Sequence, residues 1–176
     1  MADIHLPSFT AAEFSDPVNL EVLENATKII IETEAPISFD LYMERLCNAC
    51  GITRKTQKVK DRCNYLIKRL RYKTTFENIC EDPNSGRIFI WGDIENLPAY
   101  RPSDRDPKDI PIEEAAIAAV YLARSQFGMP KENLISEICK ALGFKTSTPT
   151  AKRLADKAID FAVSSGELSE ISGIIR

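Results

Sequence analysis

A dense run of basic side chains is the part of this sequence best suited to bind a ligand. Residues 54–73 hold nine basic side chains and one acid, Asp61, so the run carries a local charge of +8 on a chain of net charge −3. The remainder of the chain therefore sums to −11. A cationic stretch on an acidic body steers a polyanion to one place, and nucleic acid is the most general polyanion. The alternative is a solvated helix face with no binding role.

A helical wheel separates this run into an apolar stripe and a polar face. The apolar stripe consists of Val59, Cys63, Leu66, Ile67 and Leu70. The centre of the polar face holds Gln57, Asp61, Asn64 and Lys68. Amides at the centre of a helix face pair with base edges, and cations at its rims contact phosphates. Asp61 does not fit this pattern simply, because it would repel phosphate or else accept a hydrogen bond from cytosine N4.

The sequence therefore predicts a nucleic-acid-binding site on this helix, with one further contact from a following hairpin. Double-stranded DNA is the expected ligand, and no cofactor or metal is expected. The predicted binding residues are Arg54, Lys55, Gln57, Lys58, Lys60, Arg62, Asn64, Lys68, Arg69, Arg71 and Arg87.

The elements that must position this helix follow from capping and turn signals. Asp16-Pro17 predicts the start of a helix over 17–32, because Asp caps a helix and Pro suits its first turn. Ser38 and Gly51 bound a second helix, and a third runs from Thr56 to about Arg71. The turn-rich residues 82–86 lie between two β-type runs at 75–80 and 87–91, which predicts a hairpin.

The second half of the chain repeats this order. An offset of 92 aligns Cys47 with Cys139, Gly51 with Gly143 and Thr56 with Thr148. Helices are predicted over 111–127, over 130–142 and from Thr148 to just before Gly166, with a short hairpin in 167–176. The third helix of this half has Lys152, Arg153 and Lys157 against Asp156 and Asp160, so it is a poor phosphate binder and is expected to be structural or to dock on protein.

The predicted fold class is mainly α with short β-hairpins (α+β), arranged as a tandem winged-helix or helix-turn-helix repeat. The predicted organisation has four parts. They are an irregular leader at 1–15, a first module at 16–92, a Pro-rich linker at 93–110 and a second module at 111–176.

Composition excludes several classes of protein. Hydrophobic residues make up 44% and charged residues 28% of the 176 residues, which is typical of a globular protein. Since no apolar run of 18 residues exists and the N-terminus lacks the marks of a signal peptide, we expect no membrane association. Five cysteines without secretion favour reduced thiols in the cytoplasm.

Two other kinds of site were weighed against the sequence. A possible tetrathiolate zinc set consists of Cys47, Cys50, Cys63 and Cys80. However, Cys47 and Cys50 lie inside the predicted second helix, and Cys63 falls on the apolar stripe of the third helix. Burial as small apolar side chains therefore explains these cysteines better. His5 is the single histidine, and no phosphate-cradling glycine loop occurs. We therefore expect this chain by itself not to be an enzyme.

Several short segments resemble one family. They are Glu34-Ala-Pro-Ile37, Gly51–Arg62, Arg87-Ile-Phe-Ile-Trp91, Pro111-Ile-Glu-Glu114, Leu142-Gly-Phe-Lys145 and Gly166-Glu-Leu168. Together, over about residues 20–176, they resemble an uncharacterised C-terminal domain of large bacterial superfamily I helicase-like proteins. Ala35 departs from the glycine that is usual there, and Lys55-Thr56 replaces a Thr-Gly pair. The resemblance implies the tail of a longer protein that carries an ATP-dependent helicase motor.

Two functions from different classes follow from the sequence. The first is an accessory nucleic-acid-binding module that binds DNA through the basic third helix of the first module. The second is a docking module that packs on a helicase motor or another protein, with its cations against an acidic surface. One open surface formed by Lys58, Lys60, Arg62, Lys68 and Arg69 would favour the first function. Salt bridges from those residues to the acidic remainder of the chain would favour a solvated helix with no binding role.

Overall fold

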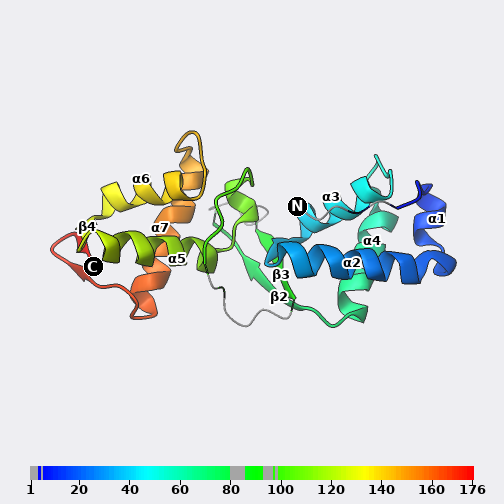
Figure 1. Ribbon diagram of the computed structural model, residues 1–176, viewed down its shortest axis with the longest axis horizontal. Helices are drawn as coiled ribbons and strands as arrows, with labels where there is room; N and C mark the ends of the chain where they lie inside the picture. Colours follow the sequence, from blue (N-terminus) through cyan, green and yellow to red (C-terminus); the bar gives the residue numbers. More distant parts are fainter. Residues whose placement is uncertain (1–3, 5, 80–85, 93–96, 98) are drawn as a thin grey trace. The chain divides into compact units, whose positions relative to one another are not determined.

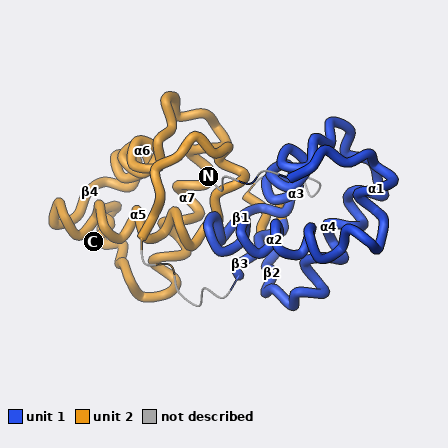
Figure 2. The backbone as a smooth tube through the Cα atoms, turned by 45° about the vertical axis from the view of Figure 1, so that its right-hand side comes forward, with its two compact units in different colours: residues 1–76, 88–95 blue, residues 77–87, 96–176 orange. Residues whose placement is uncertain are grey.

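The computed structural model describes residues 4, 6–79, 86–92, 97 and 99–176. The chain divides into two compact units, which are coloured separately in Figure 2. Unit 1 comprises Met1–Phe76 and Ile88–Glu95, and unit 2 comprises Glu77–Arg87 and Asn96–Arg176. Unit 2 thus includes residues 77–87, which form the tip of the predicted hairpin. It also includes the described part of the predicted linker.

Unit 1 is built from helices and a small antiparallel sheet (Figure 1). Its helices are α1 (Ala11–Ser15), the 3-10 turn η1 (Pro17–Asn19), α2 (Leu20–Glu34), α3 (Phe39–Ala49) and α4 (Gln57–Arg69). Its strands are β1 (Ile37–Ser38), β2 (Lys73–Glu77) and β3 (Arg87–Gly92) in the order β1-β3-β2. The register of β1 with β3 pairs Ile37 with Ile90. The first residue of β3, Arg87, and the last of β2, Glu77, are counted with unit 2.

Unit 2 has the same order of main elements. Its helices are η3 (Pro107–Asp109), α5 (Ile112–Ser125), α6 (Lys131–Ala141) and α7 (Pro149–Ser164). Its strands are β4 (Met129–Pro130), β5 (Glu170–Ile171) and β6 (Ile174–Ile175) in the order β4-β6-β5. The short strand before the second long helix pairs with the last strand of the hairpin, as β1 does with β3.

The predicted repeat is visible in these bounds. Shifted by 92 residues, β1 falls on β4, α3 falls on α6, and α2 and α4 begin where α5 and α7 begin. The fold class is mixed α+β with short antiparallel hairpins, which confirms the expectation from the sequence. Two short strands, β1 and β4, were not predicted, because two-residue strands have no period of their own.

Each unit encloses its own hydrophobic core. In unit 1 the core joins α2, α3 and α4 and includes a buried polar pair, in which Thr27 and Tyr42 share a hydrogen bond of 3.0 Å between their hydroxyls. In unit 2 the core is rich in alanine, with Ala115, Ala119, Ala155 and Ala158 all fully buried on α5 and α7. Small side chains let two helices approach closely, so α5 and α7 are in extensive contact.

The segments that precede each unit's first long helix are more ordered than the sequence indicated. The predicted leader contains α1, capped by Thr10 and Glu13, and Phe14 is fully buried. Part of the predicted linker passes the end of α6, where the Ser103 N–H donates to the Leu142 carbonyl at 3.2 Å. Gly143, with φ 93°, permits this passage because a Cβ there would lie 2.9 Å from the Ser103 carbonyl oxygen. In unit 1 the Phe9 N–H donates to the Cys50 carbonyl at 2.8 Å, and a Cβ on Gly51 would lie 2.9 Å from the Ser8 hydroxyl oxygen.

Candidate nucleic-acid interface

The helix α4 forms where capping and apolar spacing predicted the third helix. The Thr56 hydroxyl accepts from the Val59 N–H at 3.4 Å and caps its first turn. Val59, Cys63, Leu66 and Ile67 are buried along one face, which fixes the opposite face toward solvent. The helix ends at Arg69, and Arg71 follows with a positive φ of 59°. In unit 1, α1 lies beside α4 (Figure 1).

Most of the predicted binding residues are exposed on or beside this helix. The exposed ones are Arg54, Lys55, Gln57, Lys58, Lys60, Lys68, Arg69 and Arg71. Arg62 and Asn64 are half-buried on α4. Arg87, also half-buried, is counted with unit 2, where its Nε lies 3.8 Å from Asp109 Oδ1.

Three lysines form the open part of the surface. Lys58, Lys60 and Lys68, called the α4 lysines below, are exposed, and none has an acidic partner in the part of the chain that the structure describes. Arg54 before the helix and Arg71 after it share this state. Unpaired ammonium groups on a rigid helix keep their full charge available to an external anion.

Two arginines of the predicted site are committed to contacts inside unit 1. Arg62 Nη2 donates to the Ser15 carbonyl at the end of α1, and its guanidinium lies 5.8 Å from the centre of the Tyr65 ring. Arg69 Nε donates to Glu24 Oε1 on α2, and this hydrogen bond raises the pKa of Arg69. Both arginines fix α4 against its neighbours, which weakens the expectation that they contact phosphates. The sequence did not reveal these contacts, because Ser15 and Glu24 lie 47 and 45 residues away.

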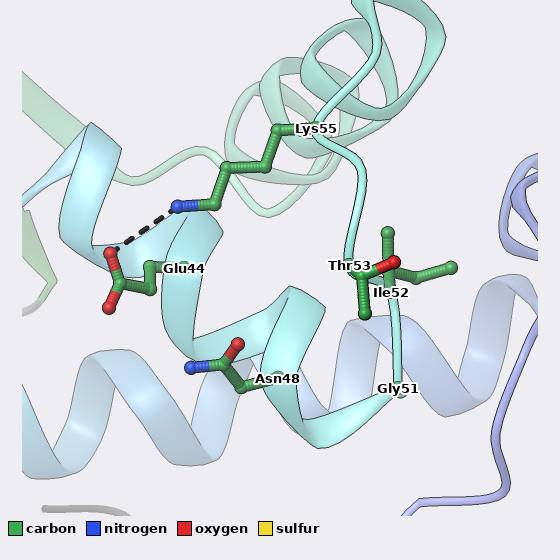
Figure 3. Close-up of a pocket in the computed structure, with 6 residues that line it drawn as sticks. All are labelled: Glu44, Asn48, Gly51, Ile52, Thr53 and Lys55. Atoms are coloured by element: carbon green, nitrogen blue, oxygen red, sulfur yellow. Dashed lines mark hydrogen bonds and ion pairs between the residues drawn. The ribbon is translucent and has the colours of Figure 1, made fainter.

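Lys55 borders a pocket at the end of α3. The pocket measures about 560 Å³ and is lined by Glu44, Asn48, Gly51, Ile52, Thr53 and Lys55 (Figure 3). The Lys55 ammonium and the Glu44 carboxylate point toward one another and form an ion pair of 3.3 Å. Both side chains keep nearly half of their surface exposed, so this pair contributes little to stability and opens readily.

A polar ridge runs along the outer face of α4. It consists of Gln57, Asp61, Asn64 and Lys68, which share one side of the helix. Gln57 Nε2 donates to Asp61 Oδ1 at 2.8 Å, so the two side chains hold each other in place. Asp61 makes no ion pair with the surrounding cations among the described residues. The ridge thus offers amides and an acid at its centre, with cations around it.

The cysteines of unit 1 are buried free thiols. Cys47, Cys50 and Cys63 belong to the core, and burial raises the pKa of each thiol, that of Cys50 to about 12. A thiol with a raised pKa is a poor nucleophile and a poor metal ligand. Within the described ranges, no three His, Cys, Asp or Glu side chains are grouped to hold a metal. Cys80 and His5 lie outside the described residues.

The corresponding helix of unit 2 uses its charges differently. Asp156 and Asp160 on α7 both bind Lys131, at 2.8 and 2.9 Å, and the hydrogen bond to Asp156 contributes most to the raised pKa of Lys131. Lys157 Nζ donates to the Asn78 carbonyl at 2.7 Å. Lys152 and Arg153 remain exposed in its first turns. Fewer open cations therefore lie on α7 than on and beside α4.

Comparison with known protein families finds one match, in unit 1. Residues 12–61 match the family described as "Protein of unknown function (DUF3320)". This segment resembles a domain of unknown function. The DUF3320-like segment spans most of α1, all of α2, β1 and α3, and the first five residues of α4. It therefore contains Gln57, Lys58, Lys60 and Asp61. No curated protein and no solved structure matches the chain.

In the described ranges, none of the helices combines the length and the apolar character that crossing a bilayer requires.

Proposed function

We propose that this chain is a non-catalytic module that binds nucleic acid, with double-stranded DNA as the ligand and α4 as the helix that meets it. The observation that carries the proposal is the state of the α4 lysines. They are exposed on one rigid helix and have no acidic partner among the described residues. Arg54 and Arg71 extend the same positive surface beyond both ends of the helix. This surface lies on a chain of net charge −3, which favours one binding orientation.

The order of elements supports a winged-helix assignment for each unit. In unit 1, α3 and α4 follow one another as a helix-turn-helix pair, and β2 and β3 follow as a hairpin. In proteins built this way the second helix of the pair enters the major groove. The α4 lysines and the polar ridge lie on that helix, which is the arrangement that the proposed function requires.

A second function is a docking surface for another protein, such as a helicase motor. One observation favours it. Val18, Val22 and Ile29 expose apolar surface at helical spacing on and before α2. The resemblance to helicase-associated tails supports a place beside such a motor. The buried free thiols favour the reducing cytoplasm as the compartment.

Salt dependence of binding tests the proposal. Fluorescence anisotropy of a labelled duplex is measured with the full chain from about 50 to 200 mM salt. If the three α4 lysines each neutralise a phosphate, log affinity falls with log salt at a slope near −2.7, which weakens binding about fortyfold over this range. The variant K58A/K60A/K68A is expected to lose most of this slope.

A charge-matched control separates a local surface from general positive charge. The variant K28A/K145A/K152A removes the same charge from exposed lysines outside α4. It is expected to bind duplex within about threefold of the unmodified chain. Equal losses in both triple variants, or no binding at about 50 mM salt, would overturn the proposal and favour the protein-docking function.

A further inference from the structure

The carboxylate of Asp61 lies where a surface made only for phosphates would have no acid. It is exposed on the central ridge of α4, with Lys58, Lys60 and Lys68 on the same helix. Its Oδ1 accepts from Gln57, and its Oδ2 has no partner in the described part of the chain. No basic side chain neutralises it there, although Lys58 is three residues away on a helix and within reach. Asp61 therefore presents a free acceptor outward.

Gln57 fixes the direction of this acceptor. Its Nε2 donates to Asp61 Oδ1 at 2.8 Å across one turn of the helix. The tethered amide leaves its own Oε1 without a partner among the described residues, so both residues present oxygen atoms to solvent. Thr56 caps the turn that carries Gln57, which keeps the pair on ordered backbone. A preorganised pair of acceptors recognises a donor at low entropic cost.

Duplex DNA offers few donors to such a pair. In the major groove the donors are the exocyclic amines, adenine N6 and cytosine N4. Adenine presents its N7 acceptor beside N6, and an acceptor faces a carboxylate unfavourably. Cytosine presents the N4 amine alone. Guanine O6 and thymine O4 are acceptors and would be rejected.

We propose that Asp61, oriented by Gln57, is a specificity-determining residue that selects a cytosine N4 amine at one position of duplex DNA. This inference rests on the proposed function, because it requires α4 to enter the major groove. The α4 lysines provide affinity for any sequence, and Asp61 lowers affinity for every site that lacks a donor at its position. The acid is then a discriminating group within a basic surface.

Selection from a randomised duplex library tests the inference with the full chain. The unmodified protein is expected to enrich cytosine at one position at least about tenfold over thymine, the gain of one well-placed base contact. D61N keeps the shape of the side chain and an oxygen acceptor for Gln57. The D61N variant is expected to bind random duplex a few-fold more tightly. Its enrichment of cytosine over thymine at that position is expected to be less than about twofold.

Two further variants complete the test. E32Q removes one acid from an exposed position on α2, and it is expected to keep the cytosine preference. Q57A releases Asp61, and it is expected to reduce the preference several-fold with little change in affinity for random duplex. These results together would establish Asp61 as the reader of the base.

The outcomes that contradict the inference are distinct from those that contradict the proposed function. Salt-dependent binding with no base preference, or a preference that D61N retains, overturns the role of Asp61 and leaves nucleic-acid binding in place. Absence of duplex binding by every form of the chain overturns both.

Discussion

The helices α4 and α7 occupy the same place in two copies of one arrangement, and their surfaces differ. Both begin at a threonine cap, Thr56 and Thr148, and in both units the helix before it is followed by a glycine with positive φ, Gly51 and Gly143. On α7 the acids bind Lys131, and Lys157 is held by a backbone carbonyl. On α4 three lysines have no acidic partner in the described ranges.

This difference extends to the interiors of the two units. Unit 2 holds Glu114 completely buried, bound by Arg101 at 2.7 Å and by Arg105 at 2.5 Å. Burial acts to raise the pKa of Glu114, but the hydrogen bonds from Arg105 and Arg101 outweigh it and lower the pKa. Unit 1 uses the neutral Thr27–Tyr42 pair in its core. One framework can thus direct charge inward, as in the Glu114 cluster, or leave it exposed to solvent, as on α4.

The largest expected effect is on the buried carboxylate of unit 2. Glu114→Ala leaves two guanidinium groups without their shared partner, and breaking a buried ion cluster costs about 3–5 kcal/mol of the free energy of unfolding. Urea denaturation followed by circular dichroism measures this loss. Glu132→Ala, at an exposed position of α6, is expected to change stability by less than about 0.5 kcal/mol. A loss below about 1 kcal/mol for Glu114→Ala would show that the cluster is not a structural centre.

The next largest effect is a difference in duplex binding between variants of α4 and variants of α7. K60A/K68A is expected to weaken duplex binding roughly thirtyfold near 0.1 M salt, since two phosphate contacts are lost. The matched change K152A/R153A on α7 is expected to weaken it less than about threefold. Anisotropy titrations of both variants measure the contrast. Equal weakening would mean that the two helices share the binding role.

Arg62 tests whether a basic residue of α4 is structural. Because its guanidinium donates to the Ser15 carbonyl, Arg62→Ala is expected to lower the free energy of unfolding by about 1 kcal/mol. The slope of affinity against salt should stay within about 0.3 of the value for the unmodified chain, whereas Lys60→Ala reduces it by about 0.9. If Arg62→Ala leaves the free energy of unfolding unchanged and reduces the slope of affinity against salt, Arg62 contacts phosphate and is not structural.

The smallest effect concerns an acid pair in unit 2. Burial raises the pKa of Glu77 to about 8, the Ile112 N–H acts to lower it, and the neighbouring Glu113 raises it further. Since the folded value exceeds the unfolded one, stability from this group is full below about pH 4 and is lost as pH rises through 8.

Removing that charge should therefore stabilise the protein increasingly as pH rises from about 4 to 8, with the full gain above that range. Glu77→Gln keeps an oxygen to accept from Ile112, whose N–H lies 2.8 Å from Glu77 Oε2. It is expected to gain about 1 kcal/mol over the unmodified chain at pH 9, a value reduced for partial exposure, and to match it near pH 4. Thermal denaturation across pH measures the gain. Equal stabilities at pH 9 would contradict the raised pKa.

The sequence predicted the helices of this fold well, because their signals are local. Thr56 and Thr148 were recognised as caps, and Gly51 and Gly143 as helix ends, from residues within one turn of each. The helix α1 was missed, since five residues provide no clear period and Phe14 is buried only by tertiary packing. A Pro-Ser pair occurs at Pro7-Ser8 and again at Pro102-Ser103, and each serine lies close to the glycine that follows a helix, Gly51 and Gly143.

The exposure of the α4 lysines was predictable from the sequence, but the contacts of Arg62 and Arg69 were not. The wheel placed Lys58, Lys60 and Lys68 toward solvent, where the structure has them. The helical wheel could not show that Arg62 and Arg69 make internal contacts whereas, among the described residues, the lysines do not, because the partners of those arginines lie far away in the chain. Long-range contacts of flexible side chains depend on the packing of α1 and α2 beside α4, which local patterns do not encode.

The most direct test of the account is a map of the residues that respond to DNA. Backbone amide NMR signals of the full chain are followed during titration with a short duplex at about 50 mM salt. The account predicts that the perturbed signals gather at residues 54–71, on and around α4, and that those of α7 (149–164) stay unchanged. Perturbations centred on α7, or none anywhere, would contradict it.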